Sequence, residues 1–209
     1  MFTKPSFAEE TALRSQGYQF VAGIDEVGRG ALMGPVMAAA VIMPAKVKGR
    51  WKSRVRDSKQ LTPKAREFLF DYIIDASVTH GIGSSSNDEI DTVGIAKATR
   101  LAMVKAVKQL IPQPQFLLID YVRLKECHYP QKGIIDGDIL CFSIACASIV
   151  AKVTRDRLVT EMDKEYPGYG LASHKGYGTP EHLACLRRIG PCPLHRRSFR
   201  PVSELLSWI

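Results

Sequence analysis

Two adjacent carboxylates close an apolar run near the start of the chain, and they restrict the fold more than any other feature. Residues 20–24 read Phe-Val-Ala-Gly-Ile, the pattern of a buried strand, and Asp25 and Glu26 follow directly. Buried acids are costly unless a cation neutralises them. A hard divalent ion such as Mg²⁺ suits this place, because it is often held by one or two carboxylates together with phosphate oxygens. The competing interpretation is an ordinary β-turn with solvated acids.

A flexible turn, Gly28-Arg29-Gly30, comes directly after this strand. Glycine lets backbone N–H groups approach a ligand closely, and the guanidinium of Arg29 suits an anion. We therefore expect a metal ion and a phosphate group to meet here.

The overall charge favours a polyanionic partner. The 209 residues carry a net charge of +8, which is typical of a protein that binds nucleic acid and less often of one that binds an anionic membrane surface. No apolar run is long enough to span a membrane, and the first ten residues lack the apolar core of a signal peptide. The five cysteines include no Cys-x-x-Cys pair, which indicates reduced thiols used for packing. We expect a cytoplasmic protein.

Extended and helical patterns alternate along the chain. We expect strands at residues 20–24, 36–43, 78–83 and 116–119, and helices at 65–76, 91–110, 139–165 and 180–190. Thr62 and Thr179 each precede a proline, the pattern of a helix start. The alternation predicts a single α/β domain over residues 1–209, with an N-terminal segment over about 1–18 and a helical C-terminal region over about 180–209.

Two further acids are placed for chemistry. Asp120 ends the strand at 116–119, at the sheet edge where α/β proteins bind ligands, although a loop acid that caps a turn would look the same. Asp138 precedes the long helix, where an ordinary N-cap is the competing interpretation. The first turns of that helix are rich in small residues, namely Ser143, Ala145, Ala147, Ser148 and Ala151. Such a helix can approach the sheet closely and carry Asp138 towards the other acids.

Four neighbouring carboxylates would repel one another unless cations neutralised them. Two bound metal ions would solve this problem and would also make the site a phosphodiester hydrolase. One ion would activate the attacking water and the other would stabilise the leaving oxygen.

Five motifs of the chain, in this order, resemble those of bacterial ribonuclease HII, the type 2 ribonuclease H. They are Gly23-Ile-Asp-Glu-Val-Gly-Arg-Gly30, Asp57-Ser-Lys-Gln-Leu61, Ala147-Ser-Ile-Val-Ala-Lys-Val-Thr-Arg-Asp156, His174-Lys-Gly-Tyr-Gly178 and His195-Arg-Arg-Ser-Phe199. The resemblance extends over about residues 20–203. It implies the ribonuclease H-like fold, which is a central mixed β-sheet flanked by helices, with a helical C-terminal region.

The resemblance also implies an activity. The protein is expected to be an endonuclease that depends on Mg²⁺ or Mn²⁺ and hydrolyses the RNA strand of RNA/DNA hybrids. It is also expected to nick duplex DNA on the 5′ side of an embedded ribonucleotide, leaving 3′-hydroxyl and 5′-phosphate ends. The four acids of the family correspond to Asp25, Glu26, Asp120 and Asp138, which would hold two divalent ions. A monomer that acts in ribonucleotide excision during DNA replication and repair is implied as well.

Substrate recognition must depend on the 2′-hydroxyl, because DNA lacks it. Backbone groups of Gly28, Arg29 and Gly30 can reach that hydroxyl and the adjacent phosphate. By resemblance, Tyr177 lies against the neighbouring deoxyribose. The candidate phosphate contacts are Lys59, Lys152, Arg155, Arg157 and Lys175, and each of them taken singly also fits a solvated surface charge.

Two basic clusters leave alternatives open. Residues 46–59 hold seven basic side chains around Trp51, which suits either a nucleic-acid backbone or a mobile solvated loop. His195-Arg196-Arg197, with Arg200, suits either a DNA strand or a brace for the C-terminal region.

The chain departs from the usual family pattern at three places: Ala31, Tyr121-Val122 and Asp136. Asp136 puts a negative charge where a lysine is often seen, beside the expected metal ions. We therefore expect tighter binding of divalent ions or weaker phosphate contact at this point.

Two other functions are less favoured. Ribonuclease HIII typically lacks the Gly-Arg-Gly turn and has an additional N-terminal domain, whereas only about 20 residues precede the first strand here. A basic RNA/DNA-binding module without catalysis would have lost at least one acid, yet all four are present.

Overall fold

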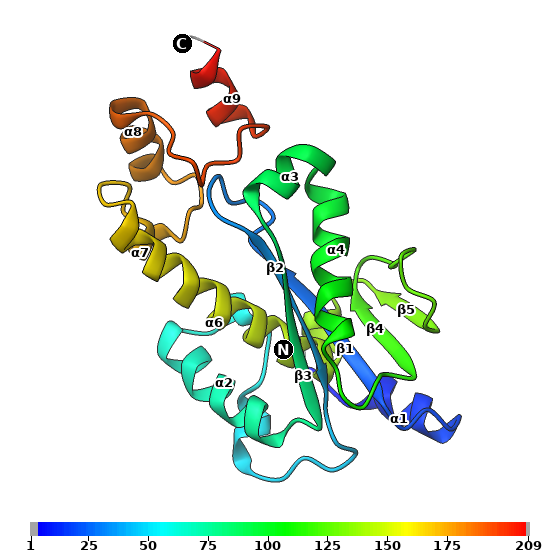
Figure 1. Ribbon diagram of the computed structural model, residues 1–209. Helices are drawn as coiled ribbons and strands as arrows, with labels where there is room; N and C mark the ends of the chain where they lie inside the picture. The colour runs from blue at the N-terminus through cyan, green and yellow to red at the C-terminus, as the bar shows by residue number, and fades with distance from the viewer. Residues whose placement is uncertain (1–3, 208–209) are drawn as a thin grey trace.

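A computed structural model describes residues 4–207 and arranges them around a five-stranded sheet with the order β3-β2-β1-β4-β5 (Figure 1). The strands are β1 (Val21–Val27), β2 (Val36–Ile42), β3 (Thr79–Ser85), β4 (Phe116–Asp120) and β5 (Gln131–Ile134). β2 is antiparallel to both of its neighbours, whereas β4 is parallel to β1 and to β5. This mixed sheet, flanked by helices, confirms the predicted fold class.

Helices cover both faces of the sheet (Figure 1). They are α1 (Ala8–Ser15), α2 (Pro63–Ala76), α3 (Asn87–Val93), α4 (Ile95–Lys108), α5 (Gly137–Leu140), α6 (Phe142–Glu165), α7 (Leu171–His174), α8 (Pro180–Ile189) and α9 (Arg200–Leu206), with short 3-10 helices η1 (Arg50–Arg54) and η2 (Ser58–Gln60). The hydroxyls of Thr62 and Thr179 accept backbone N–H groups at the starts of α2 and α8, as the sequence predicts. Within residues 4–207, no helix is both long enough and apolar enough to cross a membrane.

β2 separates two hydrophobic cores. Successive side chains of a strand point to opposite faces, so Ala39 and Val41 pack with α2 and α6, whereas Ala40 and Ile42 pack with α4. The alanines of this strand leave room for helices on both sides, and all seven of its residues are buried.

The long helix α6 approaches β1 very closely. A Cβ atom at Gly23 would lie 2.2 Å from the carbonyl carbon of Ser143, so any larger residue at position 23 would push the helix away. In α6, which packs against β1, the small residues Ser143, Ala145, Ala147 and Ser148 are all buried. The small residues therefore act as the sequence predicts, and the start of α6 lies beside Gly23 of β1.

Some element boundaries differ from those predicted. The helix expected at 139–165 is interrupted at Cys141, which is extended with φ −110° and ψ 128°. The interruption has a tertiary cause: Ser6 pairs with Cys141, accepting the N–H of Phe142 at 3.0 Å, and the Glu10 carboxylate accepts the N–H of Ser143 at 2.8 Å. These distant groups provide the N-terminal cap of α6 that the local sequence lacks.

Three other differences are smaller. The helix expected at 91–110 is divided at Gly94, whose φ of 79° ends α3 before α4 begins. β5 was not expected, because its four residues are too short and too polar to give a strand pattern. β1 continues to Val27, so Asp25 and Glu26 lie within the strand and pair with Ala39 and Ala38 of β2.

Candidate active site

Three acids meet where β1 and β4 end. The two strands are parallel neighbours, with Ile24 opposite Ile119, so the residues that follow are adjacent. One carboxylate oxygen from each of Asp25, Glu26 and Asp120 lies within 4.8 Å of the other two. Hard oxygen ligands at this spacing suit a divalent cation such as Mg²⁺ or Mn²⁺.

The electrostatics of these acids also fit a cation. Asp25 is only 4% exposed, and burial, followed by the charges of Glu26 and Asp120, raises its pKa well above the usual range. Burial likewise raises the pKa of Asp120, although the N–H of Gly137 donates to its Oδ1 at 2.7 Å. A cation would relieve both the repulsion and the cost of burial, so these three acids could hold one.

Asp138 lies beside this group and carries its own cationic partner. α5 holds it buried, with Oδ2 3.4 Å from the Nζ of Lys59. Burial and then Asp57 raise the pKa of Asp138, whereas Lys59 opposes the shift. Lys59 is positioned by η2, where the Asp57 carboxylate accepts its backbone N–H at 2.9 Å.

A cleft of about 500 Å³ opens over the three acids. It is lined by Asp25, Glu26, Val27, Gly28, Arg29, Gly30, Ser58, Lys59, Asp120, Ser148, Lys152 and Tyr177. The structure thus brings together most of the residues that the sequence singled out for metal and nucleic-acid binding.

Two serines of the cleft were not predicted as site residues. The hydroxyls of Ser58 and Ser148 lie 3.0 Å apart, and the Ser148 hydroxyl interacts with the Asp25 carboxylate. Both belong to the motifs quoted above, but the sequence singles out Ser148 only as one of the small residues that let the helix approach the sheet. Ser148 thus contacts an acid of the site directly, and Ser58 contacts Ser148.

The Gly-Arg-Gly turn has a different requirement at each glycine. Gly28 has a φ of 87°, and a Cβ there would lie 2.2 Å from Nε of Arg155. Gly30, in contrast, faces open space, so its backbone is accessible from the cleft. Between them Arg29 places Nη1 3.4 Å from Oε1 of Glu26.

Arg155 is not where a phosphate contact is expected. It is 0% exposed and donates hydrogen bonds to the carbonyls of Met33 at 3.2 Å, Pro35 at 3.0 Å and Lys175 at 3.0 Å. The guanidinium therefore holds the segment that follows the Gly-Arg-Gly turn. A sequence pattern gives no sign of this burial, because Arg155 lies in a helix next to the charged residues Asp156 and Arg157.

Arg196 has a similar place on the C-terminal side. It is buried and donates to the carbonyls of Gly34 at 3.0 Å and Arg29 at 2.8 Å. Of the two interpretations of the His195–Arg197 cluster, these contacts support the brace for His195 and Arg196. Arg200 instead lies on the surface and pairs with Glu204.

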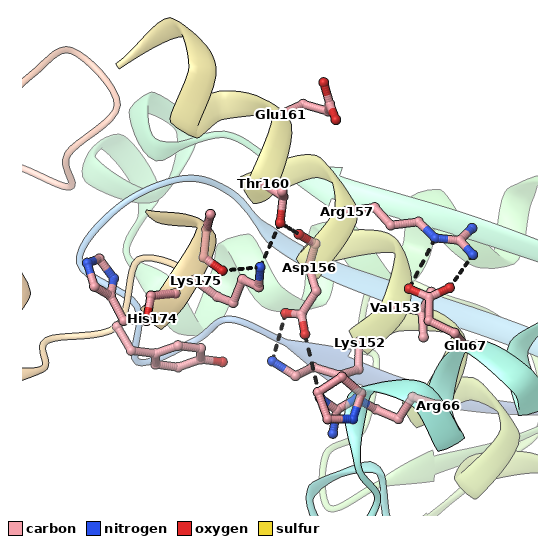
Figure 2. A pocket seen from close by; sticks show the side chains of 14 residues that line it. Arg66, Glu67, Lys152, Val153, Asp156, Arg157, Thr160, Glu161, His174 and Lys175 are labelled. Carbon is pink, nitrogen blue, oxygen red and sulfur yellow. Dashed lines mark hydrogen bonds and ion pairs between the residues drawn. The ribbon is translucent and has the colours of Figure 1, made fainter. Parts of the chain in front are cut away.

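The remaining basic candidates surround an adjoining pocket of about 710 Å³ between α2, α6 and α7 (Figure 2). Lys152 and Tyr177 line both this pocket and the cleft, whereas Arg157 and Lys175 line the adjoining pocket alone among the two. Lys152 pairs with Asp156 at 2.7 Å and Arg157 pairs with Glu67, as Figure 2 shows. Lys152 and Arg157 thus continue the charged surface beyond Asp25, Glu26 and Asp120.

The aromatic residue of the 46–59 segment belongs to the core. Trp51 is buried and stacks on Tyr72 with ring centroids 5.9 Å apart, so its face is not free for a base.

Two of the residues that depart from the family pattern have a left-handed backbone: Tyr121 and Asp136 adopt φ values of 60° and 56°. Asp tolerates this left-handed conformation, whereas it is unusual for tyrosine.

Comparisons with known proteins agree with this geometry. Residues 22–202 match the family described as Ribonuclease HII. A protein of that name from Dehalococcoides mccartyi strain BAV1 is 57% identical over 202 residues, which cover 97% of this chain and 95% of that protein. Another from Geobacillus kaustophilus is 52% identical over 197 residues, 94% of this chain and 74% of that protein.

The fold is similar to the crystal structure of ribonuclease H2 from Pyrococcus horikoshii OT3, with a TM-score of 0.72 and 27% identity. The match covers 90% of this chain and 97% of that one. The chain therefore belongs to the ribonuclease HII family, whose members are metal-dependent endoribonucleases that act on RNA/DNA substrates.

Proposed function

We propose that the protein nicks duplex DNA on the 5′ side of an embedded ribonucleotide and cuts the RNA strand of hybrids, leaving 3′-hydroxyl and 5′-phosphate ends. The observation that carries this proposal is that three of the acids (Asp25, Glu26 and Asp120), the Gly28–Gly30 turn and Tyr177 line one cleft, with Asp138 held beside it by Lys59. Acids to hold cations and groups to recognise a sugar are thus available to the same nucleotide.

Asp25, Glu26, Asp120 and Asp138 would hold two divalent ions, Mg²⁺ or Mn²⁺. Such ions supply an activated water and neutralise charge on the leaving oxygen. Lys59 opposes the rise that burial and Asp57 cause in the pKa of Asp138, and it lends positive charge to the cleft. The accessible backbone at Gly30 suits the 2′-hydroxyl and its adjacent phosphate, because a side chain in its place would fill the space.

The junction with DNA is assigned to Tyr177. Its ring lies 5.7 Å from the Nζ of Lys152, on the cleft side of α6, where a neighbouring deoxyribose can contact an aromatic face. Lys59, Lys152, Arg157 and Lys175 are proposed phosphate contacts, whereas Arg155 contributes by holding the segment that follows the Gly-Arg-Gly turn. We further infer that the chain acts as a monomer with one domain, in removal of ribonucleotides from DNA.

The test uses an end-labelled DNA duplex with one embedded ribonucleotide, a continuous RNA/DNA hybrid and an all-DNA duplex of the same sequence. Each is incubated with the protein in EDTA, Mg²⁺ or Mn²⁺. The proposal expects a metal-dependent nick 5′ of the ribonucleotide, cutting of the hybrid, and an intact all-DNA duplex.

Cutting confined to the continuous hybrid would contradict the junction specificity. Binding of the substrates without cutting of either would instead support the non-catalytic module. Size-exclusion chromatography with light scattering checks the monomer.

A further inference from the structure

Three histidines, none of which lines the acid cleft, are packed behind Tyr177. His174 ends α7, His182 lies on α8, and His195 belongs to the segment between α8 and α9. His182 and His195 are 0% and 1% exposed, and their Nε2 atoms lie 3.2 Å apart. The His174 ring stacks on that of His182 with centroids 4.4 Å apart. Buried imidazoles in such contact need a defined arrangement of protons.

The hydrogen-bond partners assign this arrangement. The N–H of Cys192 donates to Nδ1 of His195 at 3.0 Å, so the proton of the His195 ring is on Nε2. That Nε2–H donates to Nε2 of His182, which places the proton of His182 on Nδ1. The Nδ1–H of His182 then donates to the carbonyl oxygen of Tyr177 at 3.0 Å. The result is one directional chain from Cys192 to Tyr177 in which both rings are neutral.

The electrostatic surroundings agree with neutral rings. Burial, followed by the presence of His182, lowers the pKa of His195 to about 4. Burial also lowers the pKa of His182. An added proton on either ring would set two donors against each other, because every ring nitrogen of the pair already has a partner.

This chain of hydrogen bonds joins two segments that lie on either side of the residues following the Gly28–Gly30 turn. On one side Ala31 pairs with Tyr177, and the N–H of Leu32 donates to the carbonyl of Gly176 at 2.8 Å. On the other side Met33 pairs with His195. The residues after the Gly-Arg-Gly turn therefore lie between the Tyr177 segment and the His195 segment. The His182–His195 contact connects these outer segments through α8.

We propose that His182 and His195 are positioning residues, which hold the backbone of Tyr177 so that its ring faces the cleft beside the Gly28–Gly30 turn. The inference rests on the proposed function, because it is Tyr177 that meets the sugar next to the ribonucleotide. It assigns to two buried histidines a role in selecting the RNA-to-DNA junction without contact with the substrate.

The first test separates the two hydrogen bonds of His182. His182→Asn keeps a donor near Nδ1 for the Tyr177 carbonyl, whereas His182→Gln reaches towards His195 and loses that donor, and His182→Phe removes both. The readout is junction selectivity, the ratio of kcat/KM on the single-ribonucleotide duplex to that on the continuous hybrid. Loss of one hydrogen bond of about 1 kcal/mol corresponds to a loss of about fivefold in selectivity.

We expect that loss for His182→Gln and His182→Phe, mainly through KM on the junction substrate, with recovery in His182→Asn. His128→Gln, a substitution at an exposed histidine, is the matched control. Circular dichroism and Tm establish that each variant is folded. Unchanged selectivity in folded His182→Gln and His182→Phe would overturn the inference.

The second test asks whether the effect passes through Tyr177. In a Tyr177→Ala background, His182→Gln should lower selectivity no further, and an independent additional loss would overturn the inference. If Tyr177→Ala alone left selectivity unchanged, the proposed role of Tyr177 would fail, and the positioning role with it. Unchanged His182 variants together with an impaired Tyr177→Ala would reject the positioning role only.

A third measurement needs no variant. Long-range ¹H–¹⁵N correlation spectra of the imidazoles in the unmodified protein should show a protonated Nδ1 in His182 and a protonated Nε2 in His195. The opposite tautomer in either ring would break the directional chain and overturn the inference, even if the His182 variants failed to fold.

Discussion

The ammonium nitrogen of Lys59 lies 3.4 Å from Oδ2 of Asp138. Burial alone would lower the pKa of Lys59, but Asp138, Asp57 and Asp25 act together to raise it, so the ammonium stays charged. The same charge opposes the effect of burial on the pKa values of Asp138 and Asp120. Lys59 therefore helps to keep the carboxylates ionised and ready for a cation.

Replacing Lys59 by Gln should raise the pKa values of Asp138 and Asp120, because the opposing charge is lost. Carboxyl ¹³C NMR titration of the metal-free protein measures both values directly. The acid limb of the pH profile of kcat/KM should move to higher pH. Lys59→Arg retains the charge and serves as the control. Identical titration curves for Lys59→Gln and the wild type would show that the ion pair has no such influence.

Asp120→Asn should lower cleavage by at least about 100-fold while leaving hybrid affinity intact. The amide oxygen can still accept the N–H of Gly137, so the fold around the site is preserved. Single-turnover cleavage in Mg²⁺ and fluorescence anisotropy with a labelled hybrid measure the two properties. Asp71→Asn, at an exposed acid of α2, is the control. Full cleavage by Asp120→Asn would remove this acid from the catalytic group.

Asp25 should make the stability of the metal-free protein fall with rising pH. Its pKa in the folded state is raised above the unfolded value, so the ionised form opposes folding. The contribution of Asp25 to stability is therefore fully present below its unfolded pKa of about 4, and it is lost as the pH rises through the folded pKa.

Asp25→Asn should accordingly raise the Tm of the metal-free protein at neutral pH and flatten its decline above about pH 4. Each kcal/mol of relieved repulsion corresponds to about 2–4 °C for a chain of this size. Added Mg²⁺ should raise the Tm of the wild type more than that of the variant. Differential scanning calorimetry measures both effects, and a lower Tm for metal-free Asp25→Asn at neutral pH would contradict the argument.

Arg155→Lys should destabilise the fold by about 2–5 kcal/mol, because one ammonium cannot replace donors to three buried carbonyls. Urea unfolding gives this value. The salt dependence of hybrid binding should remain unchanged. Lys152→Gln should show the opposite pattern, with small loss of stability and a slope of log affinity against log salt that falls by about 1. An unchanged stability of Arg155→Lys, together with a reduced slope in the uncharged variant Arg155→Gln, would restore the phosphate contact.

Asp136→Asn should raise the Mg²⁺ concentration needed for half-maximal cleavage and lower the substrate KM. Asparagine tolerates the left-handed φ of 56° at this position, so the substitution changes charge rather than backbone. Asp136→Lys should have a larger effect in the same direction. Metal dependence and KM that both stay at wild-type values in Asp136→Lys would show that this departure from the family pattern is neutral.

The acids of the site could be found in the sequence because their signals are local. An apolar run that ends in Asp25-Glu26, a second run that ends in Asp120, and a helix of small residues after Asp138 are each visible within a few positions. The close approach of α6 to β1 at Gly23 followed from the same small residues. Threonine caps and the 3.6-residue period likewise depend on near neighbours, so α2 and α8 were placed correctly, whereas α1 and α7 were not expected.

The sequence by itself thus determined the fold class and the family, and it singled out Asp25, Glu26 and Asp120, which the structure brings together. Tertiary structure alone decided which charged residues are surface contacts and which are braces. Arg155 reaches Pro35 across 120 positions, and Arg196 reaches Gly34 across 162. The break at Cys141 and the neutral chain from Cys192 to Tyr177 also depend on partners brought together only by folding. Burial and hydrogen-bond direction are properties of the packed chain, and a local pattern of residues carries no record of them.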